Sequence, residues 1–314
     1  MKIVILDGYT TNPGDLSWEV IAAQGDLTVY DYTPPELTVE RARGAEILLD
    51  NKTPLTAEVL QQLPDCRYVG LMSTGYNIID LAQAKAQGIT VTNIPAYSTH
   101  SVAETVFALL LEICRRAGLH SESVHRGDWS NGRDFCYWLS PLTELHGKTF
   151  GIVGYGAIGQ AVAKIAEAFG MNVLACGNPA KPPKDGLVSF AQVLAGSDFV
   201  SLHCPLFPET VGLMNAGTLS QMKDGAVLIN TSRGPVVNEA DTAAALCSGK
   251  LSAFGADVLS TEPPAADNPL LSAPNTVLTP HYAWASKEAR IRLLDILAAN
   301  LRAYLAGKAQ NTVG

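Results

Sequence analysis

The sequence predicts two α/β domains, each built on a doubly wound parallel sheet. Short aliphatic or β-branched segments alternate with helical patterns twice along the chain, and a glycine-rich turn opens the first helix of the second series. The length of 314 residues agrees with two domains, because one domain usually takes roughly 100–200 residues.

The first series of strand and helix signals extends to about residue 95. Its expected strands are short apolar segments at residues 3–6, 27–30, 47–49, 68–71 and 90–92. Its expected helices lie between them, at residues 15–24, 56–62 and 80–87. Gly88 follows the last of these helices and suits the left-handed position after a helix end. Five strands that alternate with helices favour a parallel sheet covered on both faces.

A long helix is expected from Ser101, because apolar residues recur at spacings of three and four from Val102 to Ile113. The stretch 115–146 is polar and aromatic and is expected to be irregular. Its large aromatic side chains are Trp129, Phe135, Tyr137 and Trp138. Irregular segments with such side chains usually pack against another protein surface, and a second subunit is one candidate for that surface.

The second series begins at Thr149. Its expected strands are at residues 149–153, 172–176, 199–203, 226–230, 253–257 and 276–278. Helical patterns fill the gaps, for example at residues 157–169 and 239–248. A final helix at 287–306 follows the series and is expected to fold back on the first domain.

The composition excludes several classes of protein. Apolar residues make up 47% of the chain and charged residues 17%, which is ample for buried cores and excludes a disordered chain. The net charge of −8, with no run of Lys or Arg, disfavours nucleic acid and anionic membranes as partners. No segment reaches the ~18 uninterrupted apolar residues that a membrane span needs. Residues 1–8 are interpreted as a first strand rather than a signal start, because Asp7 ends their apolar run.

Six cysteines are scattered along the chain, at Cys66, Cys114, Cys136, Cys176, Cys204 and Cys247. No two form a C-x-x-C pair and none has a histidine at metal-ligand spacing, so no metal site is expected. Scattered cysteines in a long apolar chain are typical of small buried side chains in a reducing compartment. A cytoplasmic protein is therefore expected, with no catalytic role for these thiols.

Residues 154–159 (GYGAIG) form one G-x-G-x-x-G motif. The motif alone is weak, since a tight turn in a ligand-free sheet can have the same glycines. Here a strand precedes it, an apolar-periodic helix follows it, and a second strand ends near the expected ~20 residues further on. Gly154 permits the tight turn, Gly156 lets a pyrophosphate approach the backbone, and Gly159 lets helix and strand pack closely. The second series is therefore predicted to bind a dinucleotide.

The second strand of this series departs from the NAD pattern. It is followed by Gly177 and Asn178, with no Asp or Glu where a carboxylate usually receives the ribose hydroxyls of NAD. Lys181 and Lys184 are close enough in sequence to meet a 2′-phosphate. The cofactor is therefore expected to be NADP or NAD, with use of NADPH.

Three other strand ends of the second series carry ionisable residues: Arg233, the pair Asp257 and Glu262, and His281. Taken singly, each is more often a surface charge or a satisfied side chain, but the set beside a dinucleotide turn indicates an active site. Hydride transfer to a carbonyl leaves an alkoxide that needs a proton, which a histidine can supply near neutral pH. A carboxylate behind the imidazole would hold its orientation, and an arginine would bind a substrate carboxylate through two hydrogen bonds.

These motifs resemble those of the D-isomer-specific 2-hydroxyacid dehydrogenase family over nearly the whole chain. The resemblance is carried by NTSRGPVVNE, ADVLSTEPP and TPHYAWAS, together with STGYNIID (73–80) and NIPAYSTHSVAETVFALLLE (93–112). Within the family, the segments DVLSTEPPAADNPLL and TPHYAWASKEAR are most similar to those of glycerate dehydrogenases and hydroxypyruvate or glyoxylate reductases. The motifs are highly specific for the family and less specific for the substrate.

The resemblance implies a role for each of the ionisable residues. Arg233 would bind the substrate, Glu262 would be the acid behind the histidine, and His281 would be the proton donor. Asp257 would lie near the nicotinamide carboxamide, and the N–H groups of Thr74 and Gly75 would bind the substrate carboxylate. The implied cofactor contacts are Gly154, Gly156, Ala157, Ile158, Gly159, Gly177, Asn178, Cys204, Pro205, Thr210, Thr231, Ser232, Arg233, Asp257 and His281.

The resemblance also implies the architecture. A flavodoxin-like substrate domain would comprise residues 1–98 and 287–314, and a Rossmann coenzyme domain would comprise residues 99–286. A homodimer through the coenzyme domain would follow, in which Trp138 either reaches the partner's pocket or only packs at the interface. His203 is expected to make a structural hydrogen bond.

Two other functions remain open from the sequence. One is a non-enzymatic NAD(H)-sensing scaffold, because corepressors share this fold and these catalytic groups. The other is a dehydrogenase of a different small anion, such as phosphite or formate. The segments STGYNIID and ADVLSTEPP favour the reduction of 2-oxo acids over both.

Overall fold

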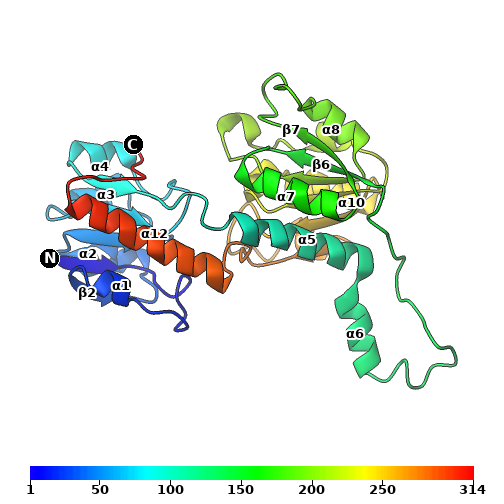
Figure 1. Ribbon diagram of the computed structural model, residues 1–314, viewed down its shortest axis with the longest axis horizontal. Helices are drawn as coiled ribbons and strands as arrows, with labels where there is room; N and C mark the ends of the chain where they lie inside the picture. Colours follow the sequence, from blue (N-terminus) through cyan, green and yellow to red (C-terminus); the bar gives the residue numbers. More distant parts are fainter. The chain divides into compact units, whose positions relative to one another are not determined.

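The computed structural model describes all 314 residues, and they form two compact units (Figure 1). Unit 1 comprises Met1–Ser98 and Ala285–Gly314, and unit 2 comprises Thr99–Trp284. The chain thus returns to unit 1 two residues before the predicted position, 287.

Unit 1 has a five-stranded sheet in the order β2-β1-β3-β4-β5, with every neighbouring pair parallel. The strands are β1 (Lys2–Ile5), β2 (Asp26–Val29), β3 (Ile47–Asp50), β4 (Tyr68–Leu71) and β5 (Thr90–Thr92). This order is that of flavodoxin-like folds, in which the chain changes direction across the sheet between the first and third strands. The order thus agrees with the flavodoxin-like fold that the resemblance implies.

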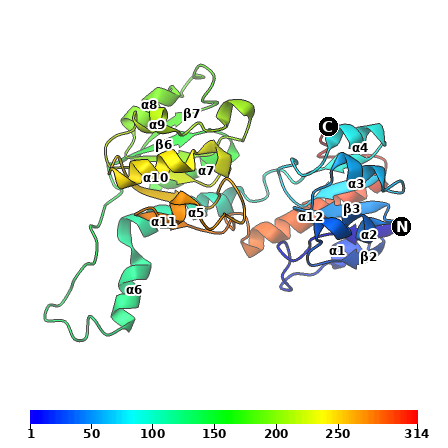
Figure 2. The same cartoon turned by 180° about the vertical axis from the view of Figure 1, so that it is seen from behind.

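Helices cover both faces of the unit 1 sheet (Figures 1 and 2). They are α1 (Glu19–Ala22), α2 (Thr38–Ala42), α3 (Ala57–Gln61), α4 (Leu81–Ala86) and α12 (Lys287–Leu305). α12 packs against α1 and β4 on one face, and α3 packs against α4 on the other. β1, β3, β4 and β5 are buried along most of their length, which explains their apolar character, whereas the edge strand β2 has no buried residue.

Unit 2 has a six-stranded parallel sheet in the order β11-β10-β9-β8-β6-β7. Its strands are β6 (Thr149–Val153), β7 (Asn172–Cys176), β8 (Phe199–Leu202), β9 (Ala226–Asn230), β10 (Leu251–Ala256) and β11 (Thr276–Leu278). A Rossmann sheet usually has a further strand beyond β7. Here that position is reduced to one hydrogen bond, from Val188 N–H to Ala175 O (2.9 Å).

Two apolar clusters cover the faces of the unit 2 sheet. α5 (Thr99–Arg115) and α7 (Ala157–Ala168) pack together on one face, where the ring of Phe107 stacks on those of Phe150 and Phe169. The other face is covered by α8 (Phe190–Gly196), α9 (Ala216–Leu219), α10 (Glu239–Cys247) and α11 (Pro269–Ser272). The strand ends that carry the predicted site therefore project from a well-packed core.

Two local predictions were wrong. The helix expected at 15–24 begins only at Glu19, because the side chain of Asn12 holds the preceding residues in a turn. Asn12 Oδ1 accepts from Gly14 N–H and Leu16 N–H, and Asn12 Nδ2 donates to Leu16 O. The stretch 115–146 is not irregular throughout, since α6 (Ala117–His125) lies within it. α6 buries only Ser123, so it has no apolar stripe from which its period could be recognised.

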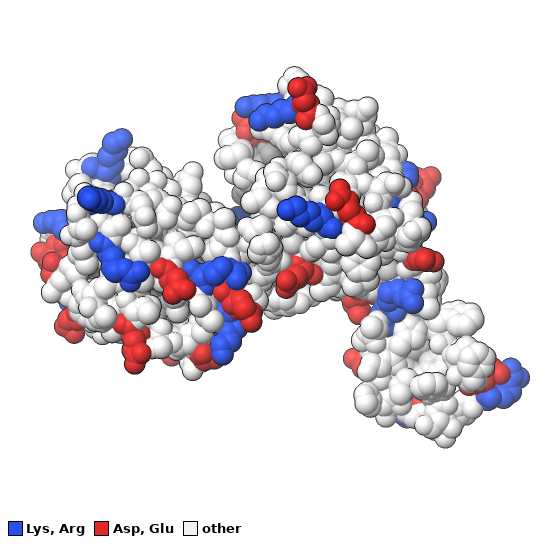
Figure 3. Space-filling view, in the orientation of Figure 1, with Lys and Arg blue, Asp and Glu red and all other residues white.

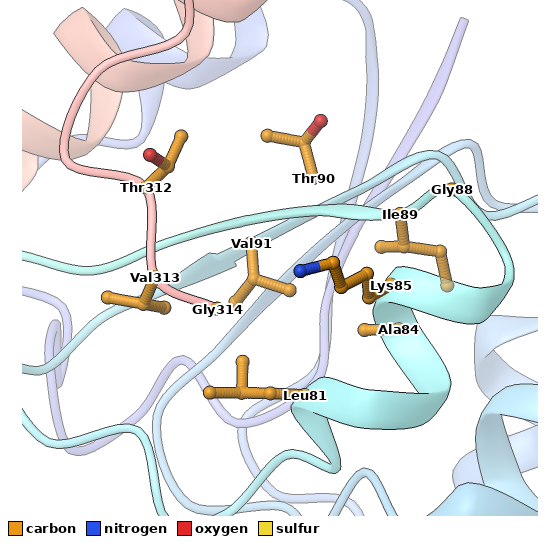
Figure 4. A pocket seen from close by; sticks show the side chains of 10 residues that line it. All are labelled: Leu81, Ala84, Lys85, Gly88, Ile89, Thr90, Val91, Thr312, Val313 and Gly314. Carbon is orange, nitrogen blue, oxygen red and sulfur yellow. The ribbon is translucent and has the colours of Figure 1, made fainter.

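Several features outside the strand ends bear on function. Basic and acidic side chains are interspersed on the face shown in Figure 3, with no large area of one sign. Val313 N–H bonds Val91 O beside β5, and a cavity of about 270 Å³ lies there (Figure 4). No group of three or more His, Cys, Asp or Glu side chains in the structure could hold a metal ion. No helix combines the length and the apolar character that a membrane crossing requires.

Candidate active site

The turn at residues 154–159 is held by close backbone packing. Gly154 has a φ of +98°, and a Cβ there would lie 2.6 Å from the backbone of His203 and Cys204. A Cβ on Gly159 would lie 2.2 Å from the carbonyl oxygen of Gly154. A Cβ on Gly156 would meet nothing within 4 Å. The fold therefore requires the first and third glycines, whereas the second leaves open space in front of the turn.

The N-terminus of α7 follows this turn without a side-chain cap. The N-cap residue is Gly156, which has no side chain to accept a hydrogen bond from the first turn of the helix. Ala157 and Ile158 occupy that turn, and Ala157 is exposed. Uncapped N–H groups and the helix dipole favour an anion at such an end.

The loop after β9 adds a polar group on the same sheet edge. Thr231 Oγ1 is buried and has no hydrogen-bond partner in the protein. Its neighbour Ser232 is fixed, because Asn230 Oδ1 accepts from its N–H (3.0 Å) and from its Oγ–H (2.9 Å). A buried hydroxyl without a partner is uncommon and is typical of a ligand-binding position. With the open turn at Gly156, these groups fit a dinucleotide whose phosphates lie at the start of α7.

The structure brings His281 and Glu262 together. His281 Nδ1 lies 2.5 Å from Glu262 Oε2, and the other oxygen of Glu262 accepts a hydrogen bond from Leu259 N–H (3.1 Å). The two side chains are 27% and 35% exposed, so they are partly desolvated and still accessible. Because Nδ1 faces the carboxylate, Nε2 is the ring nitrogen that remains to exchange a proton with a ligand.

Asp257 fixes the loop that carries His281. Its Oδ1 accepts from Thr279 Oγ–H (2.6 Å) and Tyr282 N–H (3.0 Å), and its Oδ2 accepts from Ala283 N–H (2.8 Å). The backbone of Asp257 also holds His281, whose N–H donates to its carbonyl (2.8 Å). Burial raises the pKa of Asp257 and these hydrogen bonds lower it, with burial the larger effect. Asp257 thus positions the histidine loop, a role that the sequence did not indicate.

Arg233 stands on a tightly packed turn after β9. Its side chain is exposed, and its Nη1 donates to Ser232 O (2.7 Å). Asn230 Nδ2 donates to Arg233 O (3.0 Å), and a Cβ on Gly234 would lie 1.9 Å from the backbone of Leu259. The segment with Arg233 therefore packs directly against the loop that carries Glu262, so two of the predicted catalytic groups lie on adjoining segments.

Comparison with known proteins identifies the family. Residues 107–283 match the model of the D-isomer specific 2-hydroxyacid dehydrogenase, NAD binding domain. The chain is 49% identical to a hydroxypyruvate reductase of Blautia hydrogenotrophica, over 100% of this chain and 99% of that protein. It is 46% identical to a glycerate dehydrogenase of Methylorubrum extorquens, over 90% and 89% of the two chains.

The chain belongs to the D-isomer-specific 2-hydroxyacid dehydrogenase family. Its structure is also similar to that of an NADPH-dependent glyoxylate/hydroxypyruvate reductase of Sinorhizobium meliloti, solved in complex with NADP and malonate. The TM-score is 0.83 at 29% identity, over 100% of this chain and 96% of that one. The predicted family and the predicted fold, a Rossmann domain with a second parallel α/β domain, are confirmed.

In this dehydrogenase, the residues after β7 leave room for substitution. A Cβ on Gly177 would meet only Leu187 Cδ1, at 3.5 Å. Asn178 Oδ1 accepts from Ala180 N–H (2.9 Å), and Lys181 N–H donates to Asn178 O (3.0 Å). This turn fixes Asn178, and the absence of a carboxylate here is the one departure of the site from the NAD pattern.

Unit 1 presents the N–H groups of Thr74 and Gly75 after β4. The two N–H groups donate to no group of the protein. The loop is held by its other polar atoms, since Thr74 Oγ1 donates to Ile94 O (2.7 Å) and Asn93 Nδ2 donates to Thr74 O (2.7 Å). A fixed loop with undonated N–H groups suits the binding of a carboxylate.

The structure shows protein contacts for several other predicted residues. The hydroxyl of Thr210 closes the loop after Cys204 and Pro205, because it donates to Pro205 O (2.8 Å) and accepts from Phe207 N–H (2.8 Å). His203 Nε2 lies 2.9 Å from Ser201 Oγ, and burial lowers the pKa of His203 to about 3. Burial raises the pKa of four cysteine thiols to about 11, those of Cys66, Cys114, Cys176 and Cys204.

Proposed function

We propose that the chain reduces hydroxypyruvate and glyoxylate to the corresponding 2-hydroxy acids, with NADPH or NADH as hydride donor. The observation that carries this proposal is the direct contact of His281 with Glu262 on the same sheet edge as the glycine turn. The relatives named hydroxypyruvate reductase, glycerate dehydrogenase and glyoxylate reductase support this substrate class.

The proposed mechanism gives each residue one task. A bound reduced nicotinamide supplies the hydride. Arg233 binds the substrate carboxylate and polarises the carbonyl. We also assign substrate contact to the N–H groups of Thr74 and Gly75 in unit 1. His281 gives the proton on Nε2 to the developing alkoxide, while Glu262 holds the imidazole through Nδ1. We assign the cofactor contacts and the side chains of Arg233, Glu262 and His281 to unit 2.

The proposed cofactor contacts are those predicted from the sequence. The start of α7 would hold the pyrophosphate, Cys204 and Pro205 would contact the cofactor, and Thr231 Oγ1 would donate to it. The orphaned hydroxyl of Thr231 and the open space at Gly156 support this placement. We propose that NADPH is accepted, because no carboxylate after β7 would repel its 2′-phosphate.

We also propose a cytoplasmic homodimer that associates through unit 2. α6 and the loop after it extend from the rest of unit 2 (Figure 1) and expose large apolar side chains. These are Trp129, Phe135, Trp138, Leu139 and Leu142, which are 47–88% exposed. Apolar groups gathered in this way usually mark an interface. Sedimentation of the wild type and of Trp138→Asp measures the association, and a monomeric wild type would contradict it.

A panel of small 2-oxo acids, each run with NADH and with NADPH at 340 nm, tests the activity. We expect turnover with hydroxypyruvate and glyoxylate. Cofactor binding without turnover would support the NAD(H)-sensing scaffold instead, and oxidation of phosphite or formate would support the other anion dehydrogenases.

The substitution Gly177→Asp tests the cofactor assignment. The structure has space for the side chain, and a carboxylate at this position would bind the ribose diol of NADH and repel the 2′-phosphate of NADPH. We expect the ratio of kcat/KM for NADPH to that for NADH to fall about tenfold or more. Asp185→Asn, in the same loop, is the control. Gly186→Asp is not suitable, because Gly186 has a φ of +78° and a side chain there would strain the backbone. An unchanged ratio in Gly177→Asp would contradict the assignment.

A further inference from the structure

The loop that carries Glu262 contributes no buried residue between Ser260 and Asp267. Every residue from Ser260 to Asp267 is exposed, so no side chain between them is buried in the core. The first buried residue after Glu262 in the chain is Asn268, the N-cap of α11. Such a loop needs an outside anchor if Glu262 is to stay within hydrogen-bond distance of His281.

Glu239 provides three anchoring hydrogen bonds to this loop. Its Oε1 accepts from Ser260 N–H (2.8 Å), and its Oε2 accepts from Ser260 Oγ–H (2.7 Å) and Asn268 Nδ2–H (2.8 Å). Ser260 lies two residues before Glu262 and Asn268 lies six residues after it. One carboxylate therefore ties the loop on both sides of the catalytic glutamate.

Glu239 is itself on a rigid element. It is the first residue of α10, which Asn238 caps by accepting a hydrogen bond from Asp241 N–H (3.1 Å). The N–H of Asn238 donates to Met214 O (2.8 Å). The anchor is thus attached to the core of unit 2.

A continuous series of contacts leads from Glu239 to the imidazole. Ser260, which Glu239 holds, follows Leu259 in the chain, and Leu259 N–H donates to Glu262 Oε1 (3.1 Å). Glu262 Oε2 contacts His281 Nδ1. Asp257, whose carboxylate holds the loop of His281, is the other charged group that acts on this histidine, and it is not bonded to Ser260 or Asn268.

We propose that Glu239 is a positioning residue for the reaction, which fixes Glu262 against His281 Nδ1 and so holds the imidazole in the orientation from which Nε2 gives its proton. This inference rests on the proposed roles of Glu262 and His281. Glu239 does not touch the substrate or the cofactor in this proposal, and its effect passes through the loop at 259–268.

Glu239→Gln is the test. Both oxygens of Glu239 accept hydrogen bonds, and the glutamine amide nitrogen, which is a donor, cannot accept the bond of the oxygen that it replaces. Asp241→Asn is the matched control, since Asp241 is on the same helix turn and its Oδ2 accepts from Ala216 N–H (2.9 Å), outside this loop. We expect Glu239→Gln to lower kcat/KM for hydroxypyruvate about tenfold or more. We also expect the alkaline fall of kcat/KM to begin at lower pH, and Asp241→Asn to leave both unchanged.

Two further measurements show whether the effect passes through Glu262. In a Glu262→Gln background, Glu239→Gln should add no further movement of the pH profile, because the carboxylate that it positions is gone. Ser260→Ala removes one of the three hydrogen bonds and should move the profile in the same direction by a smaller amount, which keeps the test available if Glu239→Gln folds poorly. A wild-type pH profile in Glu239→Gln, or a full additional shift in the double variant, would overturn the proposal.

Hydrogen exchange separates this proposal from the proposed function. Amides at 258–268 should exchange faster in Glu239→Gln than in the wild type and in Asp241→Asn. A wild type that reduces no 2-oxo acid would remove the proposed function, and the exchange result would still report whether Glu239 holds the loop. Unchanged exchange at 258–268 would overturn the anchoring itself.

Discussion

The two sheets of the molecule carry acidic groups at the same place, the carboxyl ends of their strands, but in opposite environments. In unit 1, Asp7 follows β1 and Asp50 is the last residue of β3, and the strand order reverses between these two strands. Asp7 is 7% exposed and Asp50 is 0% exposed. In unit 2, Glu262 is 35% exposed and contacts a histidine. The carboxyl ends of strands commonly bind ligands in both kinds of sheet. The two aspartates of unit 1 are nevertheless buried, whereas the glutamate of unit 2 is partly exposed.

The difference separates a structural carboxyl pair from a reactive one. Asp7 accepts hydrogen bonds from Asn51 N–H (2.8 Å) and Lys52 N–H (2.5 Å), so it shapes the loop after β3. Burial raises the pKa of both Asp7 and Asp50, and the Asp7 charge raises that of Asp50 further. Glu262 instead keeps one oxygen for an ionisable partner that solvent and ligands can reach. Exposure and the type of partner, rather than the strand-end position alone, distinguish the two.

The largest effect is expected from removing the histidine of the unit 2 pair. Loss of a general acid typically lowers the rate about 10²–10⁴-fold, so kcat for hydroxypyruvate should fall in that range. His281 has a φ of +54°, which asparagine tolerates better than alanine, so His281→Asn is the cleaner variant. Steady-state kinetics check this, with His125→Asn on α6 as control, and a loss of less than threefold would remove His281 from the chemistry.

Arg233→Lys should have the next largest effect. Lysine keeps the charge but loses the planar pair of donors, and a hydrogen bond to a charged group contributes about 1.5–3 kcal/mol. This corresponds to a fall in kcat/KM of roughly 10- to 150-fold for hydroxypyruvate. Arg302→Lys, at an exposed position of α12, serves as the control. If kcat/KM stayed within threefold of wild type, another group would have to bind the substrate carboxylate.

Much of this site could be predicted from the sequence because its parts follow strands of strong apolar character. Arg233, Glu262 and His281 each follow a segment whose strand pattern is clear, and parallel strands bring their carboxyl ends to one edge. The glycine turn was recognisable for the same reason. The fold and the family could therefore be predicted from short motifs.

The supporting contacts could not be predicted in this way. Glu239 is a first-turn helix acid by sequence, and nothing in its neighbours indicates bonds to Ser260 and Asn268, 21 and 29 residues away. The sequence predicts Asp257 as a cofactor contact but does not indicate that its carboxylate also accepts from Thr279 and from two backbone N–H groups. The Asp7–Asp50 pair was missed because each residue alone simply ends an apolar run. Such bonds depend on how loops meet in space.

Glu262→Gln tests the reactive pair without removing either side chain. Loss of the negative charge disfavours the imidazolium, so the pH at which reduction declines on the alkaline side should move down. Asp267→Asn in the same loop is a matched control, since it changes a charge of the same sign without a contact to the imidazole. The measurement is kcat/KM against pH. A profile that overlays the wild type would show that Glu262 does not act on the histidine.

Asp50→Asn tests the buried pair, through stability rather than activity. Below the ordinary pKa of 3.8, Asp50 is protonated in both the folded and the unfolded chain and its ionisation does not affect stability. As the pH rises through that value, the unfolded chain ionises while the folded chain keeps the proton, because burial holds the pKa of Asp50 well above it. Wild-type stability is therefore lost with rising pH until the folded pKa is reached.

An asparagine at position 50 is neutral at every pH and removes this loss. Its amide N–H2 can take the place of the protonated carboxyl, whose side chain is hydrogen-bonded to Asp7 and whose Oδ2 accepts no hydrogen bond. We expect Asp50→Asn to have a higher Tm than the wild type at pH 7, with the difference shrinking as the pH approaches 4. Asp65→Asn, an exposed aspartate of unit 1, should show no such dependence. A lower Tm for Asp50→Asn at pH 7 would mean that the Asp50 carboxylate is ionised and needed in the folded protein, and the contrast between the two strand ends would then rest on solvent access alone.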